Sequence, residues 1–186
     1  MNSNKVSVII PSFNRYDYLL NAINSIQNQT YDNYEIIVVN DGSTEDGYQS
    51  SELKSMSRVI HVDRNNTPNW GGSRPAVRNY GISEASGDFI AFLDDDDLWL
   101  PTKLERQLSE MNSKNIGFSC TDGYFGYGIY DESKKYLVYN AEHHLRKIKK
   151  KYRWTKHFKF GSFPQVWDYS FLKRHNSVVL SSVLVE

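Results

Sequence analysis

Short apolar runs alternate along the first 120 residues with segments whose apolar positions recur at helical spacing. The runs are rich in β-branched and aromatic residues and end in turn-forming residues, which is typical of buried strands. We expect these strands at 5–10, 34–39, 58–62, 89–93 and 116–120. The segments between them predict helices near 14–28, 48–57, 73–86 and 101–111. Such alternation favours an α/β fold with a mainly parallel sheet flanked by helices on both faces.

Three boundary residues lead to more detailed expectations. Pro11 should end the first strand because proline has no N–H to donate to a ladder. Asn14, with Asp17 three residues later, resembles a capping box for the first helix. Pro101 should open the fourth helix, since proline is favoured at the first helical position.

The pattern is weaker beyond Thr121. Segments 124–130 and 136–139 are rich in tyrosine and predict a β-hairpin, and 176–185 predicts a buried strand. Residues 143–157 contain seven Lys or Arg and no acid. This predicts a basic helix that contacts an anionic membrane surface or a phosphorylated acceptor, with a solvated helix or loop as the alternative.

Composition excludes several classes of protein. Lys plus Arg and Asp plus Glu both total 22, so no net positive charge would attract nucleic acid. The one cysteine, Cys120, excludes an internal disulfide and a Cys-rich zinc site. No apolar segment approaches the roughly 20 residues needed to cross a bilayer, and the N-terminus lacks the apolar core of a signal peptide. We therefore expect a cytoplasmic protein, in peripheral contact with the membrane if 143–157 binds there.

Four consecutive acids, Asp94–Asp97, directly follow the apolar run 89–93. They fall at the carboxyl end of a predicted strand, which is the edge where open α/β sheets bind ligands. Adjacent carboxylates repel one another, so a cation is the expected compensation. Magnesium and manganese typically use one or two protein carboxylates together with substrate phosphates. For such a run taken alone, a solvated acidic loop is the alternative.

Three other polar segments are predicted at the same edge of the sheet. They are Pro11–Asn14 after the first strand, Asp41–Ser43 after the second, and Arg78 with Asn79 in the third helix. In this order, the four segments resemble the family 2 glycosyltransferases with the GT-A fold, a Rossmann-like α/β arrangement. The matching text lies at 6–14, 38–44, 76–82 and 91–99, followed by Pro101, Lys103 and Leu104.

The resemblance implies that eight residues bind the donor nucleotide: Pro11, Ser12, Phe13, Asn14, Asp41, Arg78, Asp94 and Asp95. Asp41 would accept a hydrogen bond from the imide of uracil or another base, and Arg78 would lie near the pyrophosphate or orient the acids. Asp94–Asp96 matches the Asp-X-Asp motif of the family, with Asp96 as the preferred ligand of Mn²⁺ or Mg²⁺. Trp99 is expected in the core rather than under the sugar.

The implied activity is metal-dependent, inverting transfer of a sugar from a nucleoside diphosphate sugar. A UDP-sugar is the expected donor, and the acceptor would be a saccharide or lipid-linked hydroxyl in surface polysaccharide or glycoconjugate synthesis. The base of the family follows a strand that here reads 181–185, where this chain ends, so Asp168 and Asp122 are the fallback candidates. The resemblance divides the chain into a donor-binding half at 1–115 and an acceptor-side half of the same domain at 116–186, truncated at its C-terminus.

Other classes of function stay open. A non-catalytic nucleotide-sugar-binding module, or an inactive fragment, would keep Asp41 and the acids but lack a base. A nucleotidyltransferase would carry a Gly-rich phosphate loop, which does not follow the first strand here. A phosphatase with an aspartate nucleophile would carry its motif after the first strand rather than after several strands.

Overall fold

The structure, a computed structural model, describes residues 4–62, 74–126, 131, 133–138 and 178–186. The chain divides into two compact units: the first unit is Met1–Cys120 with Leu180–Glu186, and the second unit is Thr121–Val179. The C-terminal residues thus return to the first unit, so this division differs from the predicted boundary at residue 115. The donor and acceptor roles of the two parts stay a prediction.

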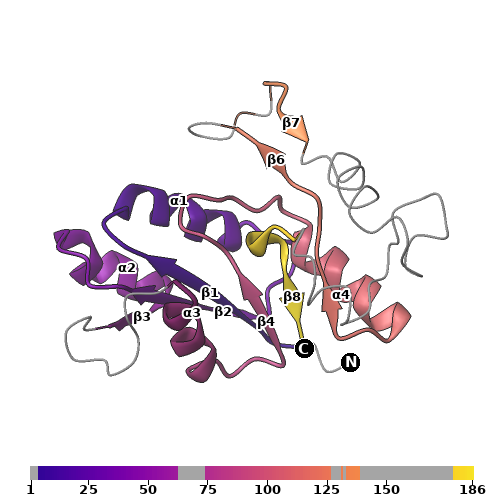
Figure 1. Ribbon diagram of the computed structural model, residues 1–186, viewed down its shortest axis with the longest axis horizontal. Coiled ribbons are helices and arrows are strands. Elements are labelled where there is room, and N and C mark those ends of the chain that lie inside the picture. Colours follow the sequence, from indigo (N-terminus) through magenta and orange to yellow (C-terminus); the bar gives the residue numbers. More distant parts are fainter. Residues whose placement is uncertain (1–3, 63–73, 127–130, 132, 139–177) are drawn as a thin grey trace, which may run out of the picture. The chain divides into compact units, whose positions relative to one another are not determined.

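The first unit is built on a six-stranded sheet with the strand order β3-β2-β1-β4-β8-β5 (Figure 1). The strands are β1 (Val6–Ser12), β2 (Tyr34–Asn40), β3 (Arg58–His61), β4 (Phe89–Phe92), β5 (Phe118–Ser119) and β8 (Leu184–Val185). Strands β1 to β4 pair in parallel, whereas β8 is antiparallel to both β4 and β5. The prediction of a mainly parallel α/β fold is therefore confirmed.

Helices cover both faces of this sheet. They are α1 (Tyr16–Gln27), α2 (Ser51–Met56), α3 (Arg74–Ser83) and α4 (Lys103–Lys114), with 3-10 turns η1 (Asp46–Gln49) and η3 (Leu180–Ser182). Residues of α1, α2 and α4 share one core cluster with Val6, Val8 and Ile10 of β1. Ile9 of β1 faces the opposite way and packs with Val77 of α3. Because both faces are buried, the strands read as continuous apolar runs.

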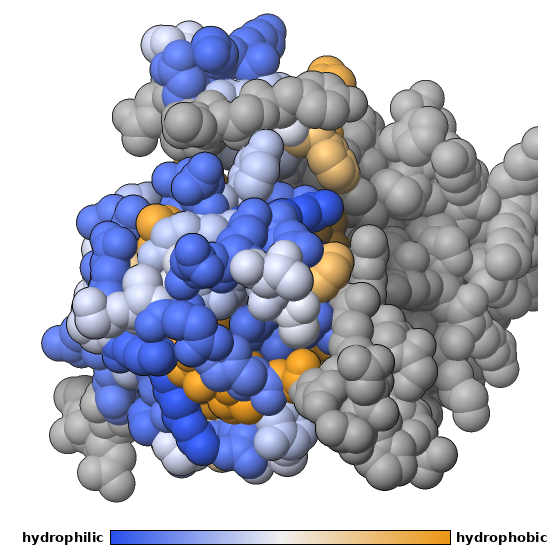
Figure 2. All heavy atoms as spheres, turned by 90° about the vertical axis from the view of Figure 1, so that its left-hand side faces the viewer, coloured by the Kyte–Doolittle hydropathy of each residue, from blue (hydrophilic) through white to orange (hydrophobic). Residues whose placement is uncertain are grey.

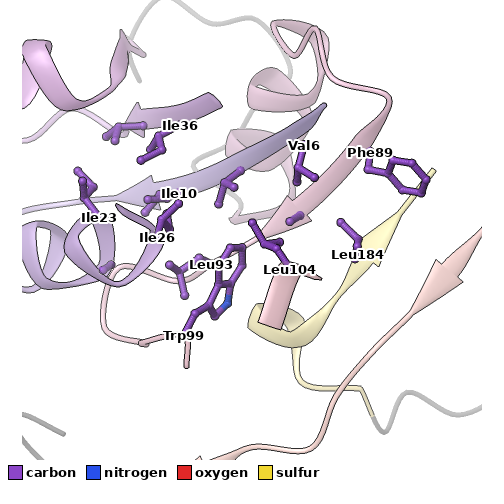
Figure 3. Close-up of a cluster of buried hydrophobic side chains, with 14 of the residues drawn as sticks. Val6, Ile10, Ile23, Ile26, Ile36, Phe89, Leu93, Trp99, Leu104 and Leu184 are labelled. Atoms are coloured by element: carbon purple, nitrogen blue, oxygen red, sulfur yellow. The ribbon is translucent and has the colours of Figure 1, made fainter. Parts of the chain in front are cut away.

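Trp99 lies in the larger of the two clusters, where Figure 3 shows it close to Leu93. Ile23 and Ile26 of α1 and Leu104 of α4 pack around the same region. Only 6% of the Trp99 surface is exposed. The prediction that Trp99 belongs to the core is confirmed.

The first strand does not end at Pro11, as the sequence had indicated. It continues to Ser12, and Pro11 stands opposite Val39 of β2. The carbonyl of Ile9 faces β4, where it accepts from the amide of Leu93. Pro11 has the same parity as Ile9, and the pairing with β4 ends at Ile9. The missing N–H of Pro11 therefore points to a side where the ladder has already stopped, and costs no hydrogen bond.

Two predicted helix starts are also wrong in detail. Arg15, not Asn14, is the N-cap of α1, and the Arg15 side chain makes no capping hydrogen bond. Asn14 adopts a positive φ of 51°, and its Oδ1 accepts from the amide of Thr44 at 2.9 Å. Helix α4 begins at Lys103, two residues after Pro101. The first difference arises because the Asn14 side chain binds the loop after β2 rather than its own helix.

The second unit contains an antiparallel pair, β6 (Tyr124–Phe125) and β7 (Leu137–Val138). The predicted hairpin strands thus pair as expected, over fewer residues. The basic segment 143–157 and Asp168 lie outside the described residues. No helix in the described part of the chain combines the length and the apolar character needed to span a bilayer.

Candidate functional site

The loops after β1, β2 and β4 meet at Ser12, the last residue of β1. The Ser12 hydroxyl donates to Asp95 Oδ2 at 2.7 Å, and the amide of Asp41 donates to the Ser12 carbonyl at 2.9 Å. Tyr48 of η1 places its hydroxyl 2.5 Å from Ser12 Oγ. Since the Ser12 proton points to Asp95, Tyr48 donates to Ser12. This buried chain of hydrogen bonds links the loops after β1 and β2 to the acid run.

Arg15 adds a positive charge to the same place. Its Nη1 lies 2.6 Å from Asp96 Oδ2 and 3.4 Å from Asp95 Oδ1, and its amide donates to the Tyr48 hydroxyl at 3.1 Å. The charges of Asp95 and Asp96 raise the pKa of the Arg15 guanidinium. Sequence reasoning missed Arg15 and Tyr48. The one signal in the sequence was that Arg15 is basic and follows Asn14, in a loop predicted to lie at the same edge of the sheet as Asp94–Asp97.

Arg78 reaches the acids from the other face of the sheet. Its guanidinium forms an ion pair with Asp94 Oδ1 from within α3. Only 14% of the Arg78 side chain is exposed, compared with 36% of the Asp94 side chain. Arg78 therefore lies where it can orient the first acid of the run, while its predicted position near a pyrophosphate stays a prediction.

The four acids face in different directions. Asp95 is 7% exposed, whereas 49% of the Asp96 side chain is exposed. Asp97 accepts a hydrogen bond from the Ser181 hydroxyl, and its amide closes the turn on the Asp94 carbonyl at 3.0 Å. Asp96 is thus the most exposed of the four acids, and Asp94, with 36% of its side chain exposed, lies two residues before it, which is the spacing of an Asp-X-Asp motif.

Burial opposes the charged forms of Asp95 and Asp97. Burial raises the pKa of Asp95, and the hydrogen bond from Ser12 and the charge of Arg15 offset only part of that effect. Burial likewise raises the pKa of Asp97, although the hydrogen bond from Ser181 opposes it. The hydrogen-bond donors around Asp95 and Asp97 therefore do not fully compensate for the burial of their negative charges.

Asn14 joins the loops that follow β1 and β2. Its amide donates to Ser43 Oγ at 3.0 Å, in addition to the contact with Thr44. Gly42, at a φ of 77°, supplies the left-handed turn between these loops. Asp41 is partly buried at the start of this turn. The predicted residues Pro11–Asn14 and Asp41 therefore belong to one connected surface, on which the Phe13 side chain is 41% exposed.

The acids suit a cation that a ligand helps to hold. The described residues contain no group of three His, Cys, Asp or Glu side chains arranged for a metal ion. Mg²⁺ and Mn²⁺ are usually bound by one or two protein carboxylates, with phosphate and water oxygens completing the shell. Asp96, with Asp94 two residues before it, fits that requirement. The positive charge of the Arg15 guanidinium already lies beside Asp95 and Asp96.

Of the two predicted bases, the structure describes Asp122 only. Asp122 is exposed in the second unit, and Asp168 is not described. In Figure 2 the described surface on one side of the molecule is mostly hydrophilic, with smaller apolar areas between. The assignment of either aspartate as a base stays a prediction.

The sequence model of Glycosyl transferase family 2 matches residues 7–173. The chain belongs to this family. An uncharacterized glycosyltransferase of Rickettsia bellii (strain RML369-C) is 44% identical over 133 residues, which are 72% of this chain and 18% of that protein. The Escherichia coli UDP-Glc:alpha-D-GlcNAc-diphosphoundecaprenol beta-1,3-glucosyltransferase WfaP is 35% identical over 119 residues, 64% of this chain and 46% of WfaP. This family 2 chain thus spans less than half the length of either relative.

Solved structures show the same fold. Residues 1–349 of S. aureus TarS in complex with UDP superpose with a TM-score of 0.54 at 25% identity, over 68% of this chain and 38% of that one. The mannosyltransferase PcManGT from Pyrobaculum calidifontis, in complex with GDP-Man and Mn²⁺, gives a TM-score of 0.53 at 20% identity, over 65% and 36% of the two chains. The GT-A fold expected from the sequence is confirmed.

Proposed function

We propose that this chain is the donor-binding part of a metal-dependent, inverting glycosyltransferase that uses a UDP-sugar. The observation that carries the proposal is the convergence of three strand-end loops on an acid run in which the Asp94 and Asp96 side chains are 36% and 49% exposed. The names of related proteins support a uridine donor: WfaP takes UDP-Glc, and a TarS structure contains UDP.

The nucleotide would lie along the edge formed by the loops after β1 and β2. Asp41 accepts a hydrogen bond from the base imide, and Pro11, Phe13 and Asn14 line the base. Asn14 supports this role by tying its loop to Thr44 at 2.9 Å. Asp94 then lies toward the ribose. The surface is assembled before the nucleotide arrives, which lowers the entropic cost of binding.

The diphosphate would lie beside Asp96, Arg15 and Arg78. A divalent cation, when bound, supplies positive charge that stabilises the departing diphosphate. Asp96 is the residue that would hold it. Arg15 Nη1 lies 2.6 Å from Asp96 Oδ2. When a cation binds Asp96, the guanidinium must release that carboxylate and can then bind a phosphate oxygen. The buried Asp95 acts from beneath by fixing Ser12 and Arg15.

Transfer itself requires a base on the acceptor side. The acceptor oxygen bonds to the anomeric carbon as the carbon–oxygen bond to the diphosphate breaks, and a carboxylate takes the acceptor proton. Asp122 and Asp168 remain the proposed candidates in this chain. Because the diphosphoundecaprenol-linked sugar in the name of WfaP is a lipid-linked acceptor, we propose a saccharide or lipid-linked acceptor for this protein, in the synthesis of a surface polysaccharide or glycoconjugate.

Calorimetric titration of the chain with UDP and GDP, with and without Mn²⁺, tests the donor site. We expect UDP to bind more tightly with Mn²⁺, and Asp96→Ala to remove the gain. Asp32→Ala is a matched control, because Asp32 is an exposed aspartate just before β2, at the opposite edge of the sheet. Equal binding with and without Mn²⁺ would contradict the metal role, and tighter binding of GDP would contradict the uridine donor.

A further inference from the structure

Ser181 contacts both ends of the acid run from a distant part of the chain. Its hydroxyl accepts from the amide of Asp94 at 3.0 Å and donates to Asp97 Oδ2. The residue is buried, with 6% of its surface exposed. A single side chain 84 residues beyond Asp97 therefore closes a bridge across the turn that presents the four acids.

Strand pairing and a tryptophan fix the position of Ser181. The residue lies in η3, and the β8 strand that follows pairs with β4 through Leu184 opposite Ala91. The indole Nε1 of Trp99 donates to the Ser181 carbonyl at 2.7 Å. Strand β4 leads directly into the acids, and Trp99 follows them. The residues on both sides of the acid run therefore hold Ser181, which bridges the run.

The hydrogen bonds of Gln107 anchor the same segment from α4. Its Nε2 donates to Ser119 Oγ at 2.9 Å and to the Ser182 carbonyl at 3.0 Å. Ser119 is in β5 and Ser182 is in η3, and the second unit lies between them in the sequence. The chain is thus fastened on both sides of that unit, which leaves little freedom for Ser181 to leave the acids.

We propose that Ser181 is a positioning residue of the metal and diphosphate site. By accepting from the amide of Asp94 and donating to Asp97, its hydroxyl fixes the turn that presents Asp94 and Asp96 before any ligand binds. Without it, the carboxylate of Asp97 loses a donor, and ordering of the turn must be supplied by the binding energy of the ligand. The inference rests on the proposed function, because it assumes that Asp96 holds a divalent cation.

The test compares Ser181→Ala with Ser113→Ala, which removes an exposed serine hydroxyl of α4 that donates to the Glu110 carbonyl at 3.0 Å. Mn²⁺ binding in the presence of UDP is measured by the loss of the free-ion paramagnetic resonance signal, and UDP binding without metal by calorimetry. We expect Ser181→Ala to weaken Mn²⁺ binding about 10-fold, the lower end of the range for residues that orient metal ligands. Ser113→Ala should leave it unchanged, and metal-free UDP binding should be equal in both variants.

Two further variants separate positioning from folding. Ser181→Cys keeps a side chain of similar size but is a weak donor, so it should weaken Mn²⁺ binding as Ser181→Ala does, with thermal unfolding close to that of the original chain. In the background of Asp97→Asn, the change Ser181→Ala should have a smaller effect, because the charge that the hydroxyl controls has gone.

Three results would overturn the inference. If Ser181→Ala and Ser181→Cys bind Mn²⁺ like Ser113→Ala, the bridge does not position the acids, and the proposed donor site stands without it. If their effect on metal-free UDP binding is equally large, the role of Ser181 is a general structural one. If the original chain shows no metal-dependent UDP binding, both this inference and the proposed function fail.

Discussion

Two carboxylate clusters occupy opposite edges of the same sheet, and they differ in how well their charge is compensated. At the amino edge, Glu35 accepts from Ser7 Oγ at 2.5 Å and from the amide and hydroxyl of Ser86 at 2.8 and 2.9 Å. Lys5 Nζ lies 3.2 Å from its other oxygen. Burial alone would raise the pKa of Glu35, but these donors outweigh it and lower the pKa to about 2.

At the carboxyl edge the balance is reversed. Asp95 and Asp97 also accept hydrogen bonds, yet burial dominates and their pKa values are raised. The two sites share a sheet and a charge sign, but the Asp95 side chain is 9% exposed and the Glu35 side chain 24%. Deeper burial and repulsion from Asp96 raise the pKa of Asp95, whereas hydrogen-bond donors lower that of Glu35. Glu35 contributes to stability, whereas the acid run is kept at a cost, which is typical of groups retained for function.

The largest expected effect separates the two edges by function. Asp96→Asn should reduce Mn²⁺-dependent binding of UDP by about 100-fold, the upper end of the range for perturbed metal sites. Glu35→Gln should leave that binding unchanged, because Glu35 contacts none of the strand-end loops. Calorimetry on both variants checks this. Comparable losses in the two variants would remove the distinction between a structural and a functional edge.

The second prediction concerns stability at the amino edge. Glu35→Gln should lower the free energy of unfolding at pH 7 by about 2 kcal/mol, since three donors lose a charged acceptor. The folded pKa of about 2 lies below the unfolded value of 4.5. The stabilisation is therefore fully present above pH 4.5 and is lost as the pH falls toward 2.

Urea unfolding of the original chain and of Glu35→Gln across that pH range measures this contribution. The two curves should converge as the pH falls from 4.5 to 2. Glu110→Gln is a control on an exposed helix carboxylate paired with Lys114. Curves that stay parallel through the acid range would show that Glu35 is not the source of the pH dependence.

A buried lysine extends the comparison to the opposite charge. Lys103 is 9% exposed, and its Nζ lies 4.0 Å from the centroid of the Trp99 ring and 2.6 Å from Gln107 Oε1. Desolvation lowers its pKa to about 7. Between that value and the unfolded value of 10.5, the unfolded chain binds the extra proton, so stability should rise with pH.

Lys103→Met should therefore raise the free energy of unfolding at pH 7 by about 1 kcal/mol, because an under-compensated buried charge is removed. The rise in stability between neutral and alkaline pH should disappear in this variant. Denaturant unfolding at pH 7 and pH 9 measures both effects. A loss of stability in Lys103→Met would mean that the contacts with Trp99 and Gln107 outweigh desolvation.

The smallest expected effect is at the acid run itself. Asp95→Asn should stabilise the metal-free chain by about 0.5 kcal/mol, because the amide keeps an acceptor for Ser12 and removes a buried charge. The same change should weaken binding of UDP with Mn²⁺, since Arg15 loses one of its partners. Thermal unfolding and calorimetry on one preparation measure both. If Asp95→Asn shows neither higher stability nor weaker binding, Asp95 has a structural role like that of Glu35.

The order of strands and helices follows from local sequence patterns, because each buried strand is a continuous apolar run and each helix has one apolar face. It also located the acid run, Asp41 and Arg78 at one edge, since parallel strands place all their carboxyl ends together. Those inferences depend on local patterns, and the family assignment confirms the fold that they describe.

Only the tertiary structure decided the details that depend on distant partners. Pro11 continues β1 because the neighbouring ladder ends at Ile9, and Asn14 binds Thr44 instead of capping its own helix. Arg15 and Ser181 were missed because their partners lie 80 or more residues away. Long-range contacts of this kind orient each of the four acids. They cannot be predicted from the spacing of four identical residues.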